Sequence, residues 1–151
     1  MGLVVELALN YRLTDIHFAL GVSQMAKLER FVDRRNDLAE RYRTALDGLP
    51  LVLPPAAPEG TRHAYHLFAV QVDDRARVYE ALAALGIGSQ VRYPPIHLHP
   101  LYADPGLRPG SFPRAEGAYG HLLSIPLFPA FTDQEHSEVV DSLRSFMATA
   151  S

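Results

Sequence analysis

The chain of 151 residues has the length of one domain and enough apolar residues for an ordinary core. With 14 basic and 17 acidic residues its net charge is -3, which gives no support for a nucleic-acid partner or an anionic membrane surface. The absence of cysteine excludes disulfides and thiolate metal sites, and no apolar run approaches the length of a membrane span, so we expect a cytoplasmic protein.

Apolar residues recur at steps of three and four between Thr14 and Gly48, which predicts one long helix or two consecutive helices. Thr14 can cap the first free N–H groups of this region, and Asp15 lies in the first turn, where the helix dipole favours a carboxylate. Gly21 stands inside the pattern, although glycine disfavours a helix by about 1 kcal/mol relative to alanine. We therefore expect another segment to pack closely against Gly21.

Two apolar runs in the middle of the chain predict strands, namely HLFAVQV at residues 66–72 and IGSQVRYPP at residues 87–95. Between them we expect a helix that is capped by Asp73 and Asp74 and ends at Gly86, a residue suited to the left-handed conformation after a helix. This order predicts an α/β layer whose helix covers one face of the sheet.

Two proline-rich stretches, residues 49–66 and residues 94–113, predict irregular connectors, and the second has the length of loop that usually carries function. SIPLFP at residues 124–129 predicts a short strand. TDQE at residues 132–135 matches the capping box and begins a terminal helix. The apolar face of that helix comprises Val139, Val140, Leu143, Phe146 and Met147.

Histidines in the second connector raise the question of a metal site. His97 and His99 could hold a metal if a third ligand came from His121, Asp104 or Glu116. The pattern fixes no third ligand. We therefore expect loop histidines that hydrogen-bond to backbone or to a ligand, and no metal centre.

Nucleophilic and phosphate-binding motifs have weak support. Ser89 and Ser124 can each be combined with a histidine, but neither lies in a G-x-S-x-G nucleophile elbow. The glycines of GIGS at residues 86–89 follow a helix and precede a strand, whereas a phosphate loop runs from a strand to a helix N-terminus. This order favours a tight turn.

Arg92 and Tyr93 stand at the end of the second predicted strand, directly before two prolines. An arginine held rigidly at the rim of a sheet can bind a carboxylate or phosphate through two parallel hydrogen bonds. A surface ion pair beside a half-buried tyrosine explains the same pattern equally well.

The stretch NYRLTD near the N-terminus is only partly explained by helix formation. Helix-start chemistry accounts for residues 13–15. It leaves three polar or aromatic residues without a role, which are Asn10, Tyr11 and Arg12.

The longer run NYRLTDIHFALGVSQMAKL, residues 10–28, resembles the DegT/StrS family of sugar aminotransferases, whose members carry a run close to N-Y-R-[LM]-T-D-I-x-x-A-x-G-x-x-Q-[LM]-x-K-L. The resemblance continues through RRNDLAERYRTAL, YHLFAVQV, LGIGSQVRYPPIHLHPLY, FPRAE and LSIPLFPAFTDQE, in family order. It implies an α/β (α+β) fold, the C-terminal small domain of a fold-type I PLP-dependent transferase. The single domain, residues 1–151, would comprise a helical linker or interface segment at residues 1–50 and a small, mostly antiparallel sheet flanked by helices at residues 62–151.

Family members transfer an amino group, usually from glutamate, to a keto sugar attached to a nucleotide in amino-sugar and polysaccharide biosynthesis. The pattern is most similar to 4-amino-sugar transaminases of the pseudaminic-acid or perosamine type. Such enzymes hold PLP on a lysine that also moves a proton. In the family that lysine lies upstream of the position of this chain's first residue, and Lys27 matches a helix-surface position instead. The resemblance implies that this chain alone binds no PLP, has no catalytic residue and is inactive.

The resemblance also gives roles to individual residues. Asn10 matches an asparagine that reaches the PLP phosphate or the substrate in a neighbouring subunit, with Tyr11 and Arg12 framing that contact. Three residues match positions near the sugar-nucleotide, which are Arg92, Tyr93 and His97. A histidine is common in the family where Arg92 stands, so the ligand that Arg92 selects is open.

Partners implied by the family are a nucleotide-sugar, glutamate, and either a second copy in a homodimer or an N-terminal PLP domain. Two alternatives stay open. The chain could be a non-catalytic remnant that binds a sugar-nucleotide or dimerises with a full-length or upstream partner. It could also belong to a small dehydratase, because some relatives replace the lysine and eliminate water.

Overall fold

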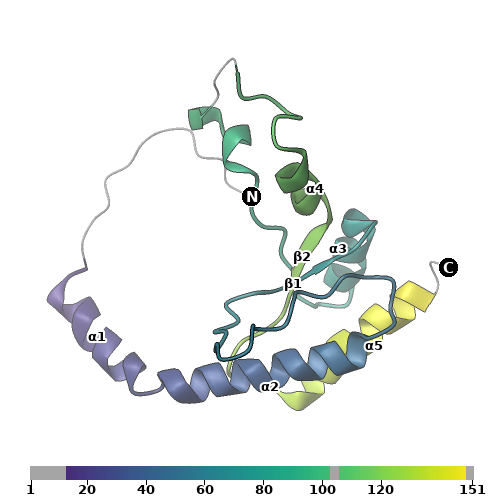
Figure 1. The fold of residues 1–151 in the computed structure, drawn as a ribbon. Helices are drawn as coiled ribbons and strands as arrows, with labels where there is room; N and C mark the ends of the chain where they lie inside the picture. The colour runs from purple at the N-terminus through teal and green to yellow at the C-terminus, as the bar shows by residue number, and fades with distance from the viewer. Residues whose placement is uncertain (1–12, 103–105, 149–151) are drawn as a thin grey trace.

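A computed structural model of the chain describes residues 13–102 and 106–148. Figure 1 shows strands at the centre of the molecule and helices around them. In chain order the elements are α1 (Asp15–Met25), α2 (Leu28–Leu46), β1 (Phe68–Gln71), α3 (Arg75–Ala84), η1 (Ile96–Leu98), η2 (Pro100–Tyr102), α4 (Pro113–His121), β2 (Leu122–Ile125) and α5 (Asp133–Ala148). The predicted fold class, helices around a small antiparallel sheet, is confirmed. No helix in these ranges is long and apolar enough to cross a membrane.

The N-terminal helical region consists of two consecutive helices, as the periodicity predicted. The predictions for Thr14 and Gly21 in this region are wrong. The side chain of Thr14 caps no backbone N–H, because its Oγ1 lies 2.9 Å from Nδ1 of His17 instead. Within the described residues nothing lies within 4 Å of a Cβ placed on Gly21, so no segment of this part of the chain packs closely there.

The sheet is built on the antiparallel pair β1 and β2, in which Phe68 pairs with Ile125 and Gln71 with Leu122. One isolated antiparallel bridge extends it on each side. Val52 pairs with Gln71 on β1, and Gln90 pairs with Ser124 on β2. The connector before β1 and the segment after α3 therefore flank the two strands.

The predicted strand over residues 87–95 is wrong, because this segment pairs with β2 only at Gln90. Pro94 and Pro95 have no N–H to donate, and Gly88 adds no side chain to pack, so the ladder ends after one bridge. The segment nevertheless runs beside β2, which places Arg92 and Tyr93 near the sheet.

Other boundaries differ from the sequence-based expectations. The strand expected at residues 124–129 begins earlier, since β2 spans Leu122–Ile125. Helix α4 was not predicted, because Gly117 and Gly120 within its nine residues weaken a helical pattern. Its start is conventional, with Pro113 in the first turn, where no intrahelical N–H is required.

Unlike the cap at Thr14, the predicted caps of α3 and α5 are confirmed, with Asp74 as the residue that caps α3. Asp74 accepts a hydrogen bond from the N–H of Arg77 at 3.2 Å, and Gly86 ends the α3 region with a φ of 74°. At the start of α5 the capping box is complete. The N–H of Thr132 donates to Oε2 of Glu135 at 2.8 Å, and the N–H of Glu135 donates to Oγ1 of Thr132 at 3.2 Å.

The core is one cluster to which α2, both strands, α3 and α5 all contribute. Its largest fully buried side chains are Tyr42, Phe68, Leu38, Leu46, Leu82, Leu123, Leu143 and Val70. Tyr42 also donates its hydroxyl to the carbonyl oxygen of Pro126 at 3.0 Å, and this satisfies its one buried polar group. The core thus joins α2 to the part of the chain after residue 62.

Helices α2 and α5 are also joined by charge. Asp133 accepts hydrogen bonds from Arg34 at 2.7 Å and from Arg41 at 2.5 Å. These two guanidinium groups, Arg34 first, lower the pKa of Asp133 to about 2. The carboxylate is exposed, so the pair fixes the approach of the helices more than it adds stability.

His136 on α5 is the histidine most deeply inside this core. It is 3% exposed, its ring lies 4.0 Å from that of Tyr42, and its Nε2 has no hydrogen-bond partner. Burial lowers the pKa of His136, and the positive charge of Arg41 lowers it further. A hydrogen bond with the backbone of Leu38 and the negative charge of Asp133 oppose this shift without reversing it. His136 is therefore held neutral in the folded protein at neutral pH.

This burial predicts a pH dependence of stability. Since an unfolded histidine titrates at about 6.5, the unfolded chain binds more protons below that pH and the free energy of unfolding falls. The stability that neutral His136 provides above about pH 6.5 is lost as the pH falls toward its lowered folded pKa. Urea unfolding at pH 7.5 and 5.5 should show a smaller loss in His136→Phe than in the wild type. An equal loss in both proteins would contradict the assignment, and His17→Phe, at an exposed position, is the control.

Candidate functional site

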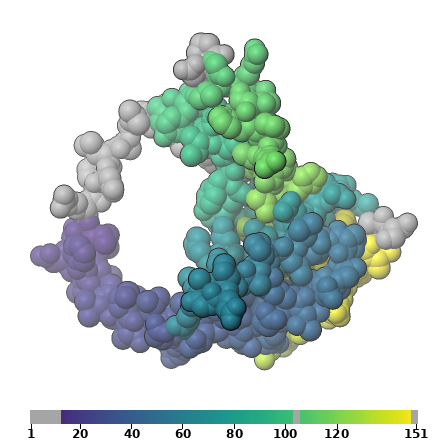
Figure 2. All heavy atoms as spheres, viewed as in Figure 1, coloured from purple at the N-terminus to yellow at the C-terminus, as the bar shows by residue number. Residues whose placement is uncertain are grey.

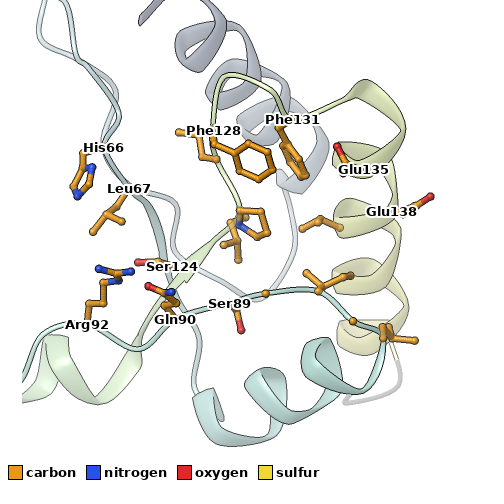
Figure 3. Close-up of a pocket in the computed structure, with 18 residues that line it drawn as sticks. His66, Leu67, Ser89, Gln90, Arg92, Ser124, Phe128, Phe131, Glu135 and Glu138 are labelled. Atoms are coloured by element: carbon orange, nitrogen blue, oxygen red, sulfur yellow. The ribbon is translucent and has the colours of Figure 1, made fainter. Parts of the chain in front are cut away.

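A cavity of about 560 Å³ lies between the end of β2, the segment after α3 and the start of α5. Figure 3 shows its two ends. His66, Gln90, Arg92 and Ser124 gather at one end, and Phe128 and Phe131 lie toward the other, near α5. The cavity therefore has a polar, basic end and an aromatic end, and Glu135 and Glu138 of α5 also line the aromatic end.

The polar end is held in place by the sheet. The N–H of Gln90 donates to the carbonyl oxygen of Ser124, and the N–H of Ser124 donates to that of Gln90, each at 2.9 Å. Gly86 makes this approach possible, because its positive φ turns the chain out of α3 and lets the N–H of Ile87 return to the carbonyl oxygen of Leu82 at 2.9 Å. Arg92 follows two residues after the bridge.

Arg92 has unused hydrogen-bonding capacity beside the cavity. Its Nη1 donates to the hydroxyl of Tyr93 at 3.1 Å, and its guanidinium carbon lies 5.6 Å from the centre of that ring. Its Nε is buried without a partner, and among the described residues Arg92 forms no ion pair. A buried donor without an acceptor is unfavourable, and a rotation of the side chain that exposes Nε to an oxygen of a bound anion would relieve this.

Tyr93 lies on the outside of this arrangement. It is 62% exposed, and its one hydrogen bond among the described contacts is the one from Arg92. The sequence alone does not decide between an anion-binding arginine and a surface ion pair beside a half-buried tyrosine. The ion pair is not found within the described ranges, and the tyrosine is more exposed than half-buried. Arg92 and Tyr93 together form a pair of a partly buried cation and an exposed aromatic ring.

His97 is placed differently from Arg92 and Tyr93. It is 8% exposed, its Nε2 lies 3.0 Å from Oε1 of Glu116, and its ring packs 4.8 Å from that of Phe112. His97 does not line the cavity that Arg92 borders. Direct contact between His97 and a ligand stays a prediction.

The contact of Glu116 with His97 was not predicted from the sequence, which suggested Glu116 only as a possible metal ligand. Hydrogen bonds from the backbone N–H groups of Gly110 and Phe112, and then His97, lower its pKa. A carboxylate in the first turn of α4, three residues after Pro113, was the signal that could have drawn attention to it.

Asn10, Tyr11 and Arg12, the predicted cofactor-binding residues, lie outside the described residues, and so does Asp104. In the described ranges no three His, Asp or Glu side chains come together in a way that could hold a metal ion. The positions of Asn10, Tyr11 and Arg12 relative to Arg92 are not part of the observed geometry.

The sequence profile of the DegT/DnrJ/EryC1/StrS aminotransferase family matches residues 2–144. Among curated proteins the chain is 33% identical over 144 residues to the spore coat polysaccharide biosynthesis protein SpsC of Bacillus subtilis. It is 36% identical over 139 residues to the dTDP-3-amino-3,4,6-trideoxy-alpha-D-glucose transaminase of Streptomyces venezuelae. These matches cover 90% and 91% of the chain but only 37% and 36% of the relatives.

Solved structures give the same result for the fold. The crystal structure of Streptomyces venezuelae DesV in complex with a ketimine intermediate matches with a TM-score of 0.84 at 35% identity. That match covers 90% of this chain and 37% of DesV. The chain thus spans somewhat more than a third of the length of the proteins it resembles.

The unpaired Nε of Arg92 predicts an anion-binding site. Isothermal titration with inorganic pyrophosphate should give saturable binding that Arg92→Gln weakens at least about tenfold, because a hydrogen bond to a charged group contributes about 1.5–3 kcal/mol. Arg114→Gln, at an exposed position on α4, should bind as the wild type does. Equal affinities for the wild type and Arg92→Gln would refute the site.

Proposed function

We propose a function from one established premise, that the chain belongs to the DegT/DnrJ/EryC1/StrS aminotransferase family. It acts as the C-terminal portion of a PLP-dependent, cytoplasmic transaminase that converts a nucleotide-linked keto sugar to an amino sugar. The names of two relatives support this substrate class, since one is a dTDP-amino-sugar transaminase and the other a polysaccharide biosynthesis protein.

The observation that carries the proposal is the unpaired Nε of Arg92 beside the cavity. A nucleotide-sugar brings a diphosphate, and glutamate brings carboxylates. Either anion offers oxygens to a guanidinium group. We assign the diphosphate to Arg92, with the exposed ring of Tyr93 available for packing against the sugar or the base.

The cofactor is not expected to be held by this chain. PLP supplies the electron sink for amino transfer when a lysine binds it. Lys27 is the single lysine in the sequence, and it stands at the junction of α1 and α2, where it does not line the cavity beside Arg92. These residues do not fit a PLP site built on a lysine, so the chain's own contribution is to bind and orient the substrate.

Helix α1 supports a shared site. None of its residues is buried, and its large apolar side chains lie on opposite faces. One face carries Ile16 and Leu20, and the other carries Phe18, Val22 and Met25, with exposures of 59–75%. Figure 2 shows α1 extending from the end of α2, with open space between it and the body of the molecule. A helix that is apolar all round is normally enclosed.

We therefore propose that α1 is covered by a second copy or by an N-terminal PLP domain. Residues 10–12, which directly precede α1 in sequence, would then contact the cofactor of the neighbouring subunit. The alternative of a non-catalytic remnant that binds a sugar-nucleotide shares Arg92 with this proposal and differs in having no PLP-bearing partner.

Covalent trapping tests the division of labour. Addition of PLP and borohydride to the isolated chain should give no stable adduct by mass spectrometry, and Lys27→Arg should behave in the same way. When a segment corresponding to the rest of a family aminotransferase is supplied, the adduct should form on that segment. A stoichiometric adduct on Lys27 of the isolated chain would overturn the proposal.

Sedimentation equilibrium tests the role of α1. The isolated chain should self-associate with rising concentration to bury this apolar helix, and the double variant Ile16→Glu and Val22→Glu should stay monomeric. Val52→Glu, which changes an apolar side chain that is 58% exposed outside α1, serves as the control and should associate like the wild type. A wild-type chain that is monomeric at high concentration would count against an interface on α1.

A further inference from the structure

Glu116 accepts hydrogen bonds from several separate parts of the chain. Its Oε2 accepts from the N–H of Gly110 at 2.8 Å, and its Oε1 accepts from the N–H of Phe112 at 3.0 Å. Oε1 also lies 3.0 Å from the N–H nitrogen of Gly110 and 3.0 Å from Nε2 of His97. One carboxylate therefore ties His97 to a turn more than ten residues further along the chain.

The protonation states of this pair follow from the contacts. The backbone donors and His97 lower the pKa of Glu116, so it is ionised at neutral pH. A carboxylate can only accept hydrogen bonds, so Nε2 of His97 must carry a proton and donate to it. The ring of Phe112, whose centre lies 4.8 Å from that of the imidazole, packs against His97 and also holds it in place.

His97 is one end of a short segment whose other end is also fixed. At residue 90 the segment is fixed to β2 by the two hydrogen bonds between Gln90 and Ser124. At residue 97 it is fixed to α4 by Glu116. We call residues 90–97 the rim segment, and it carries Arg92 and Tyr93 between its two attachments.

The rim segment transmits the constraint from His97 because it is stiff. Pro94 and Pro95 have φ fixed by their rings and separate Tyr93 from the short helix η1. The N–H of Leu98 closes that helix on the carbonyl oxygen of Pro95 at 2.9 Å. A shift of His97 would therefore move Tyr93, whereas a flexible linker would absorb it.

We propose that Glu116 is a positioning residue that sets the conformation of Arg92 and Tyr93 for ligand binding, through His97 and the rim segment. The ligand in this inference, a nucleoside diphosphate, rests on the proposed function. The effect of Glu116 on the conformation of Arg92 and Tyr93 does not depend on a ligand. Loss of the carboxylate should release one end of the rim segment and leave the attachment at Gln90 intact.

The test uses the full chain and the isosteric variant Glu116→Gln, with Glu80→Gln, at an exposed position on α3, as the matched control. In Glu116→Gln, amide exchange at Gly110 and Phe112 should rise at least tenfold. The NMR signals of the Tyr93 amide and the Arg92 Nε–H should shift or broaden in this variant and not in the control. Thymidine diphosphate should bind at least tenfold more weakly.

A second variant separates positioning from helix capping. His97→Leu has no donor for Glu116, so it removes the link to the rim segment while Glu116 keeps its bonds to Gly110 and Phe112. It should alter the signals of Arg92 and Tyr93 with little change in exchange at Gly110. In a double-mutant cycle, Arg92→Gln combined with Glu116→Gln should lose less affinity than the product of the two single losses. The variant at His97 also keeps the test valid if Glu116→Gln fails to fold.

The outcomes are distinct. Faster exchange at Gly110 and Phe112 with unchanged signals of Arg92 and Tyr93 would overturn the inference, because Glu116 would then only stabilise the start of α4. Fully additive losses of affinity would overturn it as well. If the wild type binds no thymidine diphosphate while the two signals still respond to both variants, the proposed function fails and the positioning role is supported.

Discussion

The antiparallel pairing of β2 is the interaction on which the rest of the structure depends. On one side β2 pairs with β1 along four residues, and on the other Ser124 pairs with Gln90. These hydrogen bonds join β1 to the segment that carries Arg92, and the bridge between Val52 and Gln71 adds the connector after α2 on the other side of β1. Helices α2, α3 and α5 then enclose the apolar side chains of the strands. The cavity lies beside the bridge between Gln90 and Ser124, lined mainly by residues 85–90 and 124–128.

The molecule divides into a well-packed body and parts whose packing is incomplete. Tyr42, Phe68 and Leu143 are completely or almost completely buried, and α2 and α5 are further joined through Asp133. In contrast, α1 has no buried residue, and Arg92 keeps an unpaired donor. Both features are unfavourable for an isolated chain. The chain spans little more than a third of the length of its relatives, and both features are expected if, as we propose, its site is shared with other segments.

The sequence predicted those parts of the structure that depend on local chemistry. The helical period, the cap at Asp74, the turn at Gly86 and the capping box of Thr132 all act within a few residues. The errors arose where long-range packing decides. Residues 87–95 have strand composition but meet only one partner residue, and α4 forms in spite of Gly117 and Gly120.

The site shows the same division between local and long-range chemistry. The rim position of Arg92 followed from its place before two prolines, but the bonds from His97 and Gly110 to Glu116 join distant residues that no spacing rule connects. The family resemblance supplied the fold, because its motifs extend along almost the whole chain. It left the partner of His97 undetermined.

The most direct test of the central claim, that Arg92 is the anion-binding group of this domain, is a crystal structure of the chain with thymidine diphosphate. We predict a phosphate oxygen about 2.7–2.9 Å from Nε of Arg92, the usual length of a charge-assisted hydrogen bond. A nucleotide bound elsewhere, with Nε of Arg92 still unpaired, would contradict the claim.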